Sequence, residues 1–343
     1  MDTLDQEFER ILNDVLEKYP EKAKNLNIES IISDITSKAF TLRKKSLLES
    51  AENMLLERRQ LAKEFVERNI NRWSNAFDIL EMHIVICTEA GEDFNNSYRP
   101  QAVEENNLVF DLVVRHHARA CHIAQEILCL LKNGFADAAH ARWRALHEVT
   151  ATAMFIAKHG QECAERFYFH DIVDSYEGMK EHKKYEDRLQ AKGPSQEEIN
   201  GCQEDYNHLI NRYGKKYADH YGWASYLFPN HGKVGFAAIE KDVQLDHMRP
   251  YYKWASQNIH ASSKGMSNRL GLCEATEDLL LVGQSNSGMT DPAHAMAISL
   301  SQITSTLLTL EPTLAHLVTM KIISDFEKQV GNTFLEIDTQ NDS

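Results

Sequence analysis

The chain has 343 residues, of which 43% are hydrophobic and 26% are charged, ordinary values that exclude a chain disordered throughout. Its 15 glycines and 7 prolines are about half the average share, and so few turn-forming residues argue against a many-stranded β fold. The formal net charge of −14 excludes non-specific coating of nucleic acid or of an anionic membrane, although a local basic face could still bind either.

The cysteines and the N-terminus both indicate a cytoplasmic protein. None of the six cysteines forms a Cys-x-x-Cys pair, which excludes a zinc ribbon and a thioredoxin-type motif. The chain begins MDTLDQEFER, which is acidic and lacks an apolar signal region. The longest uncharged apolar stretch, residues 292–310, is interrupted by Ser, Thr and Gln and is too polar to span a membrane. We therefore expect a buried core helix there and no membrane partner.

The first hundred residues are predicted to form a helical arm. Apolar residues at helical spacing from Leu4 to Leu16 predict a first helix. Residues 28–72 contain no Gly or Pro and many leucines, and they predict a second, long helix. Residues 73–90 predict a third helix, which Gly91 and a polar loop would close.

Part of this arm is locally basic. Residues 41–72 carry eight Lys or Arg against five Asp or Glu in an otherwise acidic chain. The interpretation that we favour is a solvated helix face with i,i+4 pairs such as Glu64–Arg68. The alternative is an electrostatic contact with a partner or with nucleic acid. A long amphipathic helix outside the main core also predicts a homo-oligomer formed through the arm.

The centre of the core is predicted to be an antiparallel helical hairpin. Residues 108–131 form a helical pattern, and Asn133-Gly134 is typical of a left-handed helix stop. Asp137 could then cap the return helix, residues 138–158. The alanines of the return helix would allow neighbouring helices to approach closely.

The chain beyond the hairpin is predicted to be helical as well. Residues 171–221 are strongly polar, and Ser195 with Glu198 matches a capping box, which suits either a protruding hairpin or a mobile lid. Residues 250–261 predict a helix that begins at a proline, and Pro312 should break the last core helix.

The predicted fold class is therefore all-α, a helical bundle with an N-terminal helical arm. We divide the chain into the arm, residues 1–100, the bundle, residues 101–330, and a frayed tail, residues 331–343.

A polar stripe follows the predicted return helix. His140, Arg144, Glu148 and Thr152 recur every four residues and share one face, and His147 lies beside them. The rest of the helix is apolar, so this face should be buried, where an Arg or a Glu needs a partner. Two interpretations are equally open: the Arg and the Glu pair with each other, or the stripe lines a pocket between helices.

A second stripe lies downstream, where Tyr252, Ser256 and His260 are four residues apart. A Ser–His hydrolase is a weak hypothesis, because one helix cannot also supply an oxyanion hole and no nucleophile-elbow motif is present. We favour a Ser–His hydrogen bond in the core.

A third group, Arg115, Arg119, His122 and Glu126, shares one face of the helix predicted over residues 108–131. It could form another wall of the same pocket. We favour a solvated surface instead, because charged residues are mostly exposed.

The sequence NGFADAAHARWRALHE, with Arg144 and Glu148 in an Arg-x-Leu-x-Glu pattern, resembles an uncharacterised bacterial helical family, the domain of unknown function five-six-seven-seven. The Tyr252, Ser256 and His260 helix resembles the second pattern of that family. The resemblance extends over about residues 108–310. It implies an all-α fold in which the two motif helices are adjacent, and it implies no activity.

A weaker analogy links the chain to nucleases with the higher eukaryotes and prokaryotes nucleotide-binding fold, which carry an Arg four to six residues before a His. Arg142 with His147 and Arg115 with His122 match this spacing. About two such matches are expected by chance in a chain of this composition, so the motif alone carries no weight. Histidine can nevertheless move a 2′-hydroxyl proton, and arginine can hold a phosphate.

The absence of a His-Glu-x-x-His, a Gly-x-Gly-x-x-Gly or a Walker loop predicts no metal and no cofactor. We expect a cytoplasmic bacterial protein whose interhelical pocket binds a phosphate-bearing ligand, a nucleotide or RNA, and which could act as a metal-independent ribonuclease in defence. The candidate catalytic residues are Arg144, His147 and His260. The candidate ligand-binding residues are His140, Glu148, Tyr252 and Ser256. The alternative is a non-enzymatic scaffold or interaction protein in which the stripes are internal ion pairs.

Overall fold

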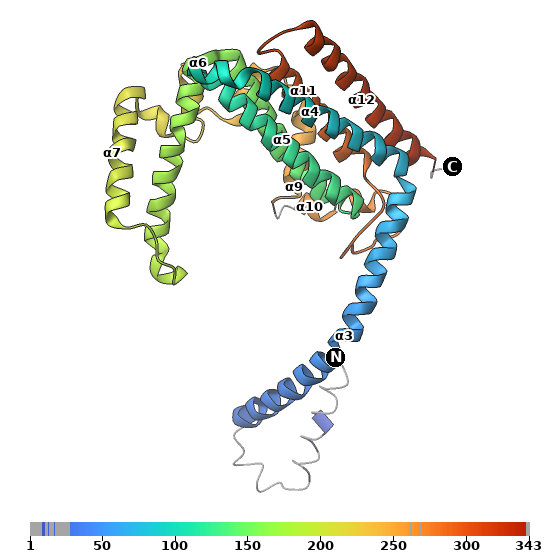
Figure 1. Cartoon of the computed structure of the whole chain (residues 1–343). Coiled ribbons are helices and arrows are strands. Elements are labelled where there is room, and N and C mark those ends of the chain that lie inside the picture. The colour runs from blue at the N-terminus through green and yellow to red at the C-terminus, as the bar shows by residue number, and fades with distance from the viewer. Residues whose placement is uncertain are drawn as a thin grey trace. The chain divides into compact units, whose positions relative to one another are not determined.

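The structure, a computed structural model, describes residues 28–260, 263–267 and 269–340, together with the isolated positions 9, 10, 13 and 17. Every element in these ranges is a helix (Figure 1), which confirms the all-α class. The helix predicted from Leu4 to Leu16 falls outside the described residues, apart from the isolated positions. Within the same ranges, no helix is both long enough and apolar enough to cross a membrane.

The chain divides into two compact units, residues 1–65 and 66–343. The predicted long helix is α3 (Ile28–Arg72), which runs through this boundary. Residues 66–100, which the sequence assigned to the arm, fold with the second unit because Phe77 and Leu80 are buried in its core.

Five helices build the core of the second unit: α4 (Ser74–Glu104), α5 (Leu108–Lys132), α6 (Ala136–Leu189), α11 (Thr290–Leu308) and α12 (Leu314–Thr339). α5 and α6 form the predicted antiparallel hairpin, and Gly134 at φ 79° closes the turn between them. α11 packs against the other four helices and is buried on most of its surface, which explains its apolar, uncharged sequence.

α4 continues through Gly91, where the sequence predicted its end. A side chain at this position would place its Cβ 2.2 Å from Cε1 of His117 on α5. The glycine therefore serves the close approach of two helices rather than a turn. Because a single sequence does not show which helix lies opposite, the glycine was mistaken for a helix end.

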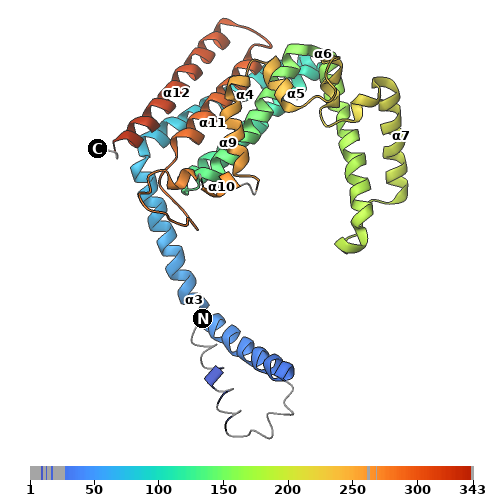
Figure 2. The same ribbon diagram turned by 180° about the vertical axis from the view of Figure 1, so that it is seen from behind.

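α6 contains a sharp break at Gly160, whose φ of 75° is not helical. Beyond it, the second half of α6 pairs with α7 (Gln196–Tyr213) in a hairpin that extends away from the core helices (Figures 1 and 2). The predicted capping box is present, since Ser195 and Glu198 bond reciprocally.

Shorter helices connect α7 to α11: η1 (Lys215–Ala218), η2 (Gly222–Leu227), α8 (Phe236–Asp242), η3 (Asp246–Met248), α9 (Arg249–Gln257), α10 (Ser263–Ser267) and η4 (Leu270–Leu272). α9 is shorter than the helix predicted over residues 250–261, and residue 261 lies outside the described ranges. Asp137 does not cap α6. Its carboxylate instead accepts the backbone N–H groups of Leu270 at 2.9 Å and Gly271 at 3.2 Å.

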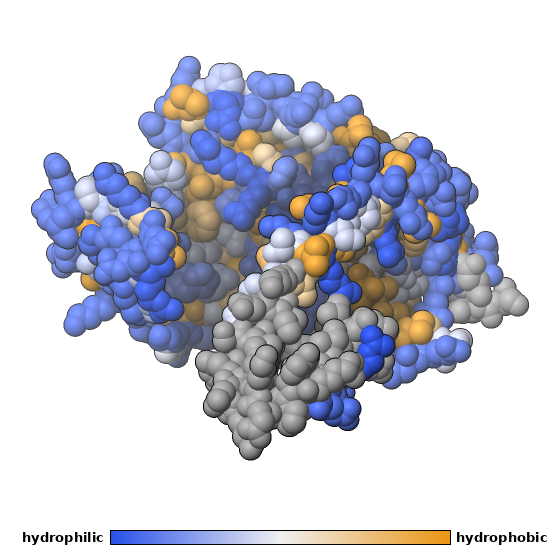
Figure 3. All heavy atoms as spheres, turned by 90° about the horizontal axis from the view of Figure 1, so that it is seen from below, coloured by the Kyte–Doolittle hydropathy of each residue, from blue (hydrophilic) through white to orange (hydrophobic). Residues whose placement is uncertain are grey.

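The end of the chain is more ordered than its composition predicts. Pro312 lies between α11 and α12, as expected, but α12 continues to Thr339 through the segment that we expected to be frayed. The reason is Phe334, which is fully buried and stacks on Trp73 with 5.5 Å between ring centroids. The face shown in Figure 3 is mostly hydrophilic, with hydrophobic side chains in small groups.

Candidate functional site

The two motif helices are neighbours in the structure. α9 lies antiparallel to the first half of α6, with Trp254 beside His140 and Tyr252 beside Arg144. Near the far end of α9, Asn258 donates to the carbonyl of Asp137 at 3.4 Å. The adjacency that the resemblance implied is therefore present.

Arg144, Glu148 and Tyr252 form one interaction group. The guanidinium of Arg144 lies 3.2 Å from Oε1 of Glu148 and 4.8 Å from the centroid of the Tyr252 ring. The Tyr252 hydroxyl donates to the same carboxylate oxygen. Burial, together with this hydrogen bond, raises the pKa of Tyr252 to about 12, so the phenol stays protonated as a donor.

A second carboxylate, which the sequence pattern did not indicate, lies next to this group. Glu240 on α8 has a fully buried side chain and accepts from Nε2 of His147 at 2.9 Å. Its other oxygen accepts from Arg249, at the start of α9. Glu240 thus joins α6, α8 and α9. The available sequence signal was a lone carboxylate directly after the apolar run Phe236–Ile239.

Arg249 was also missed, because its role depends on Glu240. Its guanidinium carbon lies 5.2 Å from the centroid of the Tyr252 ring, so two guanidinium groups contact this ring. The Arg144 and Arg249 side chains are 24% and 30% exposed, which leaves both within reach of solvent.

His140 is fully buried between aromatic rings. It stacks on Trp143 at 5.5 Å between centroids, and its ring meets that of Trp254 edge to face at 5.1 Å. Burial lowers the pKa of His140 to about 4, so its imidazole is neutral at neutral pH. We call His140, Arg144, His147, Glu148, Glu240, Arg249 and Tyr252 the α6–α9 cluster.

Several buried polar atoms at this interface have no hydrogen-bond partner among the described residues. They are Nδ1 and Nε2 of His140, Nε of Arg144, Nδ1 of His147 and Oε1 of Gln257. Buried polar atoms are normally bonded, to protein, water or a bound molecule. Their concentration on the facing helices α6 and α9 makes this interface the strongest candidate for a ligand site.

Residues 110–278 match a family described as Family of unknown function (DUF5677). This segment, just under half of the chain, is similar to that family, which supports the resemblance that the motifs indicated. No curated protein and no solved structure matches the chain. The segment begins within two residues of the predicted start but ends 32 residues before the predicted end, ahead of α11. It contains α7, α8, α9 and nearly all of the α5–α6 hairpin.

Not every predicted site residue joins the cluster. Ser256 donates to the carbonyl of Tyr252 at 2.7 Å, within its own helix. His260 is exposed and follows the end of α9, about two turns beyond Tyr252. Of these three residues it is Tyr252 that joins the cluster, through its hydrogen bond to Glu148.

In neither of the two Arg–His pairs that match the nuclease spacing do the two side chains share a partner. Arg142 bonds Glu126 on α5, whereas His147 bonds Glu240. The Arg115 side chain is 69% exposed and pairs with Asp111 at 2.7 Å. The His122 side chain is 73% exposed. This face of α5 is a solvated surface, as we favoured.

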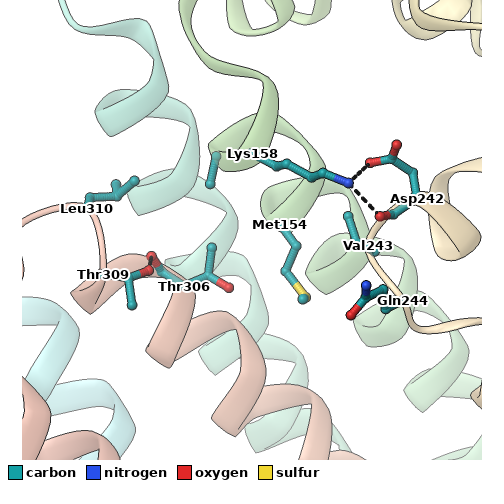
Figure 4. A pocket seen from close by; sticks show the side chains of 9 residues that line it. Met154, Lys158, Asp242, Val243, Gln244, Thr306, Thr309 and Leu310 are labelled. Carbon is teal, nitrogen blue, oxygen red and sulfur yellow. Dashed lines mark hydrogen bonds and ion pairs between the residues drawn. The ribbon is translucent and has the colours of Figure 1, made fainter.

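An open groove of about 470 Å³ lies further along α6, partly outside the DUF5677 segment (Figure 4). Lys158 and Asp242 line one side, and Thr306 of α11 and Thr309 just after that helix line the other. Burial alone would raise the pKa of Asp242, but hydrogen bonds from Lys158 and His159 hold it below its ordinary value. None of the residues that line this groove has a buried polar atom without a partner among the described residues, so the groove is a weaker candidate for a ligand site than the α6–α9 cluster.

Proposed function

We propose that the α6–α9 cluster binds a phosphate-bearing ligand such as a nucleotide. Arg144 carries the proposal, because its guanidinium is partly exposed while its buried Nε has no partner among the described residues. Arginine holds phosphate oxygens through paired N–H groups, and Arg249 brings a second guanidinium to the same tyrosine ring.

The carboxylates define what else the ligand must offer. The Glu148 side chain is 35% exposed, so it can accept from a hydroxyl or amino group of the ligand while Arg144 turns toward the phosphate. Glu240 is fully buried and holds Arg249 and His147 in place. A ligand with both an anionic group and a hydrogen-bond donor, as in a nucleotide, fits this set better than a simple anion.

The proposal concerns binding and not catalysis. The His147 ring is fully buried, and its Nε2 bonds Glu240. A proton transfer to a ligand at Nε2 would first require the displacement of that carboxylate. Ribonuclease activity and a role in defence therefore stay predictions from the sequence pattern, and an RNA cleavage assay with the wild type and Arg144→Ala tests them.

Calorimetric titration with AMP and with inorganic phosphate tests the binding proposal. We expect the wild type to bind AMP, more tightly than phosphate, and Arg144→Ala to bind neither detectably. The matched control is Arg142→Ala, two residues away on the same helix, which should bind like the wild type because Arg142 contacts Glu126 on α5. Wild-type protein that binds neither probe, or a control as defective as Arg144→Ala, would refute the proposal.

A non-enzymatic scaffold is the second candidate function, because both cluster arginines have a carboxylate partner within the protein. In that case Arg144→Ala should lower the melting temperature while the wild type shows no response to AMP. Removing Arg144 leaves the carboxylate of Glu148 without its cation, and this uncompensated charge is the reason for the lower melting temperature.

A further inference from the structure

The part of α3 in the first unit exposes many large apolar side chains. Between residues 40 and 65, the most exposed are Phe40 64%, Leu42 70%, Leu47 59%, Leu48 67%, Met54 45%, Leu55 42%, Leu56 66% and Leu61 50%. A single helix in water gains little from packing and is only marginally stable. A helix with such a surface is typical of one that packs against another chain.

These side chains follow a repeat of seven residues. Phe40, Leu47, Met54 and Leu61 are seven apart, and Leu48 and Leu55 follow two of them directly. We call Phe40, Leu47, Met54 and Leu61 the first row. Four residues after each of its members lies a last row, which consists of Lys44, Ala51, Arg58 and Phe65. In a heptad, the first row occupies the d positions and the last row the a positions, which together form the seam of a coiled coil.

We propose that α3 pairs with α3 of a second copy of the chain as an antiparallel coiled coil centred between Glu52 and Asn53. The direction follows from two charged residues in the seam. A parallel, in-register pair would place Lys44 against Lys44 and Arg58 against Arg58 of the second copy, which is unfavourable for like charges at close range.

The antiparallel register avoids both of these like-charge contacts. Lys44 then faces Leu61 of the second copy, and Arg58 faces Leu47, so their aliphatic stems cover leucines while their charges reach water. The centre pairs the small Ala51 with the long Met54, which suits close packing.

The flanks of the seam are complementary in the same register. On one side Leu48 faces Leu55 of the second copy, and on the other Arg43 faces Glu64. Each contact occurs twice, because the pair has twofold symmetry. Only Leu42 and Leu56, of the eight exposed apolar residues, lie on the outer face.

A nucleic acid is a poorer partner for this surface. A phosphate backbone would contact the basic residues and leave the apolar row in water, whereas a second copy covers six of the eight apolar side chains.

Light scattering on the full-length protein tests the association. We expect the wild type to have twice the chain mass of 39.3 kDa, and Leu47→Glu/Met54→Glu to have the single-chain mass. The matched control is Leu42→Glu/Leu56→Glu, which makes the same kind of change on the outer face and should stay a dimer. Far-UV circular dichroism checks that all proteins are folded. A monomeric wild type, or a control that dissociates as readily as the seam variant, would overturn the proposal.

Disulfide cross-linking tests the direction, in a background where the exposed Cys129 and Cys273 are replaced by serine. In the antiparallel register Leu47 faces Arg58, so Leu47→Cys/Arg58→Cys should give a covalent dimer under oxidation. Leu47→Cys alone should not, because the two copies of residue 47 lie 11 residues apart along the axis, about 16 Å. Cross-linking by the single variant would show a parallel pair and refute the register.

Charge exchange tests the flank. Arg43→Glu should raise the dimer dissociation constant about tenfold. Arg43→Glu/Glu64→Arg should restore it, because the exchange recreates both opposite-charge contacts. Failure of the double variant to recover would exclude the Arg43–Glu64 contact and with it the proposed register.

Discussion

Two polar stripes in this protein look alike in sequence and differ in the structure. On α5, Arg115 and His122 lie on one helical face with side chains 69% and 73% exposed. On α6, the Arg144 side chain is 24% exposed and that of His147 is fully buried. The difference comes from α8 and α9, which cover α6 and supply Glu240 and Tyr252. The same residue types thus form a solvated surface or a buried cluster according to the element that packs over them.

We expect the largest effect on stability from the buried carboxylate of Glu240. Glu240→Ala leaves Arg249 without its carboxylate partner and His147 without its acceptor, and we expect the free energy of unfolding to fall by about 3–5 kcal/mol. Urea denaturation measures this change. The control is Arg115→Ala on α5, whose effect should stay within about 0.5 kcal/mol. Equal effects of the two variants would mean that the two stripes do not differ energetically.

The second-largest effect is expected at acid pH, where the buried stripe should lower the stability of the protein. The pKa of His140 is lowered from its ordinary 6.5 to about 4 by burial. Between these pH values the unfolded chain binds more protons than the folded one, so stability is fully present above pH 6.5 and is lost as the pH falls toward 4. The loss of unfolding free energy that this residue causes between pH 6.5 and pH 4 is about 3 kcal/mol.

The measurement compares unfolding free energies at pH 7 and pH 4.5 for the wild type and His140→Asn. The variant should depend less steeply on pH, although His83 and His117, also with pKa values of about 4, keep part of the dependence. His122→Asn, on the exposed face of α5, should leave the wild-type profile unchanged. If it flattened the profile as much as His140→Asn, the assignment to the buried ring would be wrong.

The smallest effect is expected for Tyr252→Phe. It removes the hydroxyl that donates to Glu148 but keeps the ring beneath the guanidinium groups, so the loss should be about 1 kcal/mol. Tyr251→Phe, in an exposed neighbour, is the control. The melting temperatures of the two variants measure the difference. A loss for Tyr252→Phe no greater than for the control would indicate that Glu148 gains nothing from this bond.

Local signals in the sequence predicted much of the fold. The turn at Gly134, the capping box at Ser195 and the break at Pro312 depend on neighbours within a few residues, and each was found. Gly91 and Phe334 were misinterpreted, because their roles come from His117 and Trp73, far away in the chain.

The candidate site divides in the same way. Helical spacing predicted that Arg144 and Glu148 could pair, and the family resemblance implied that Tyr252 would be near. Glu240 could not be predicted, since its partners come from two other helices. His260 was included on the assumption that α9 would continue to residue 260, but that helix ends at Gln257.

The shortness of α9 has a consequence for how the cluster opens. Nine residues are too few to hold a helix in water, so α9 depends on its attachments, Asn258 to Asp137 near one end and Arg249 to Glu240 at the other. Breaking either attachment should release the segment as one piece and leave the main bundle intact. The amide hydrogens of α9 should then exchange with solvent together, and sooner than those of α11.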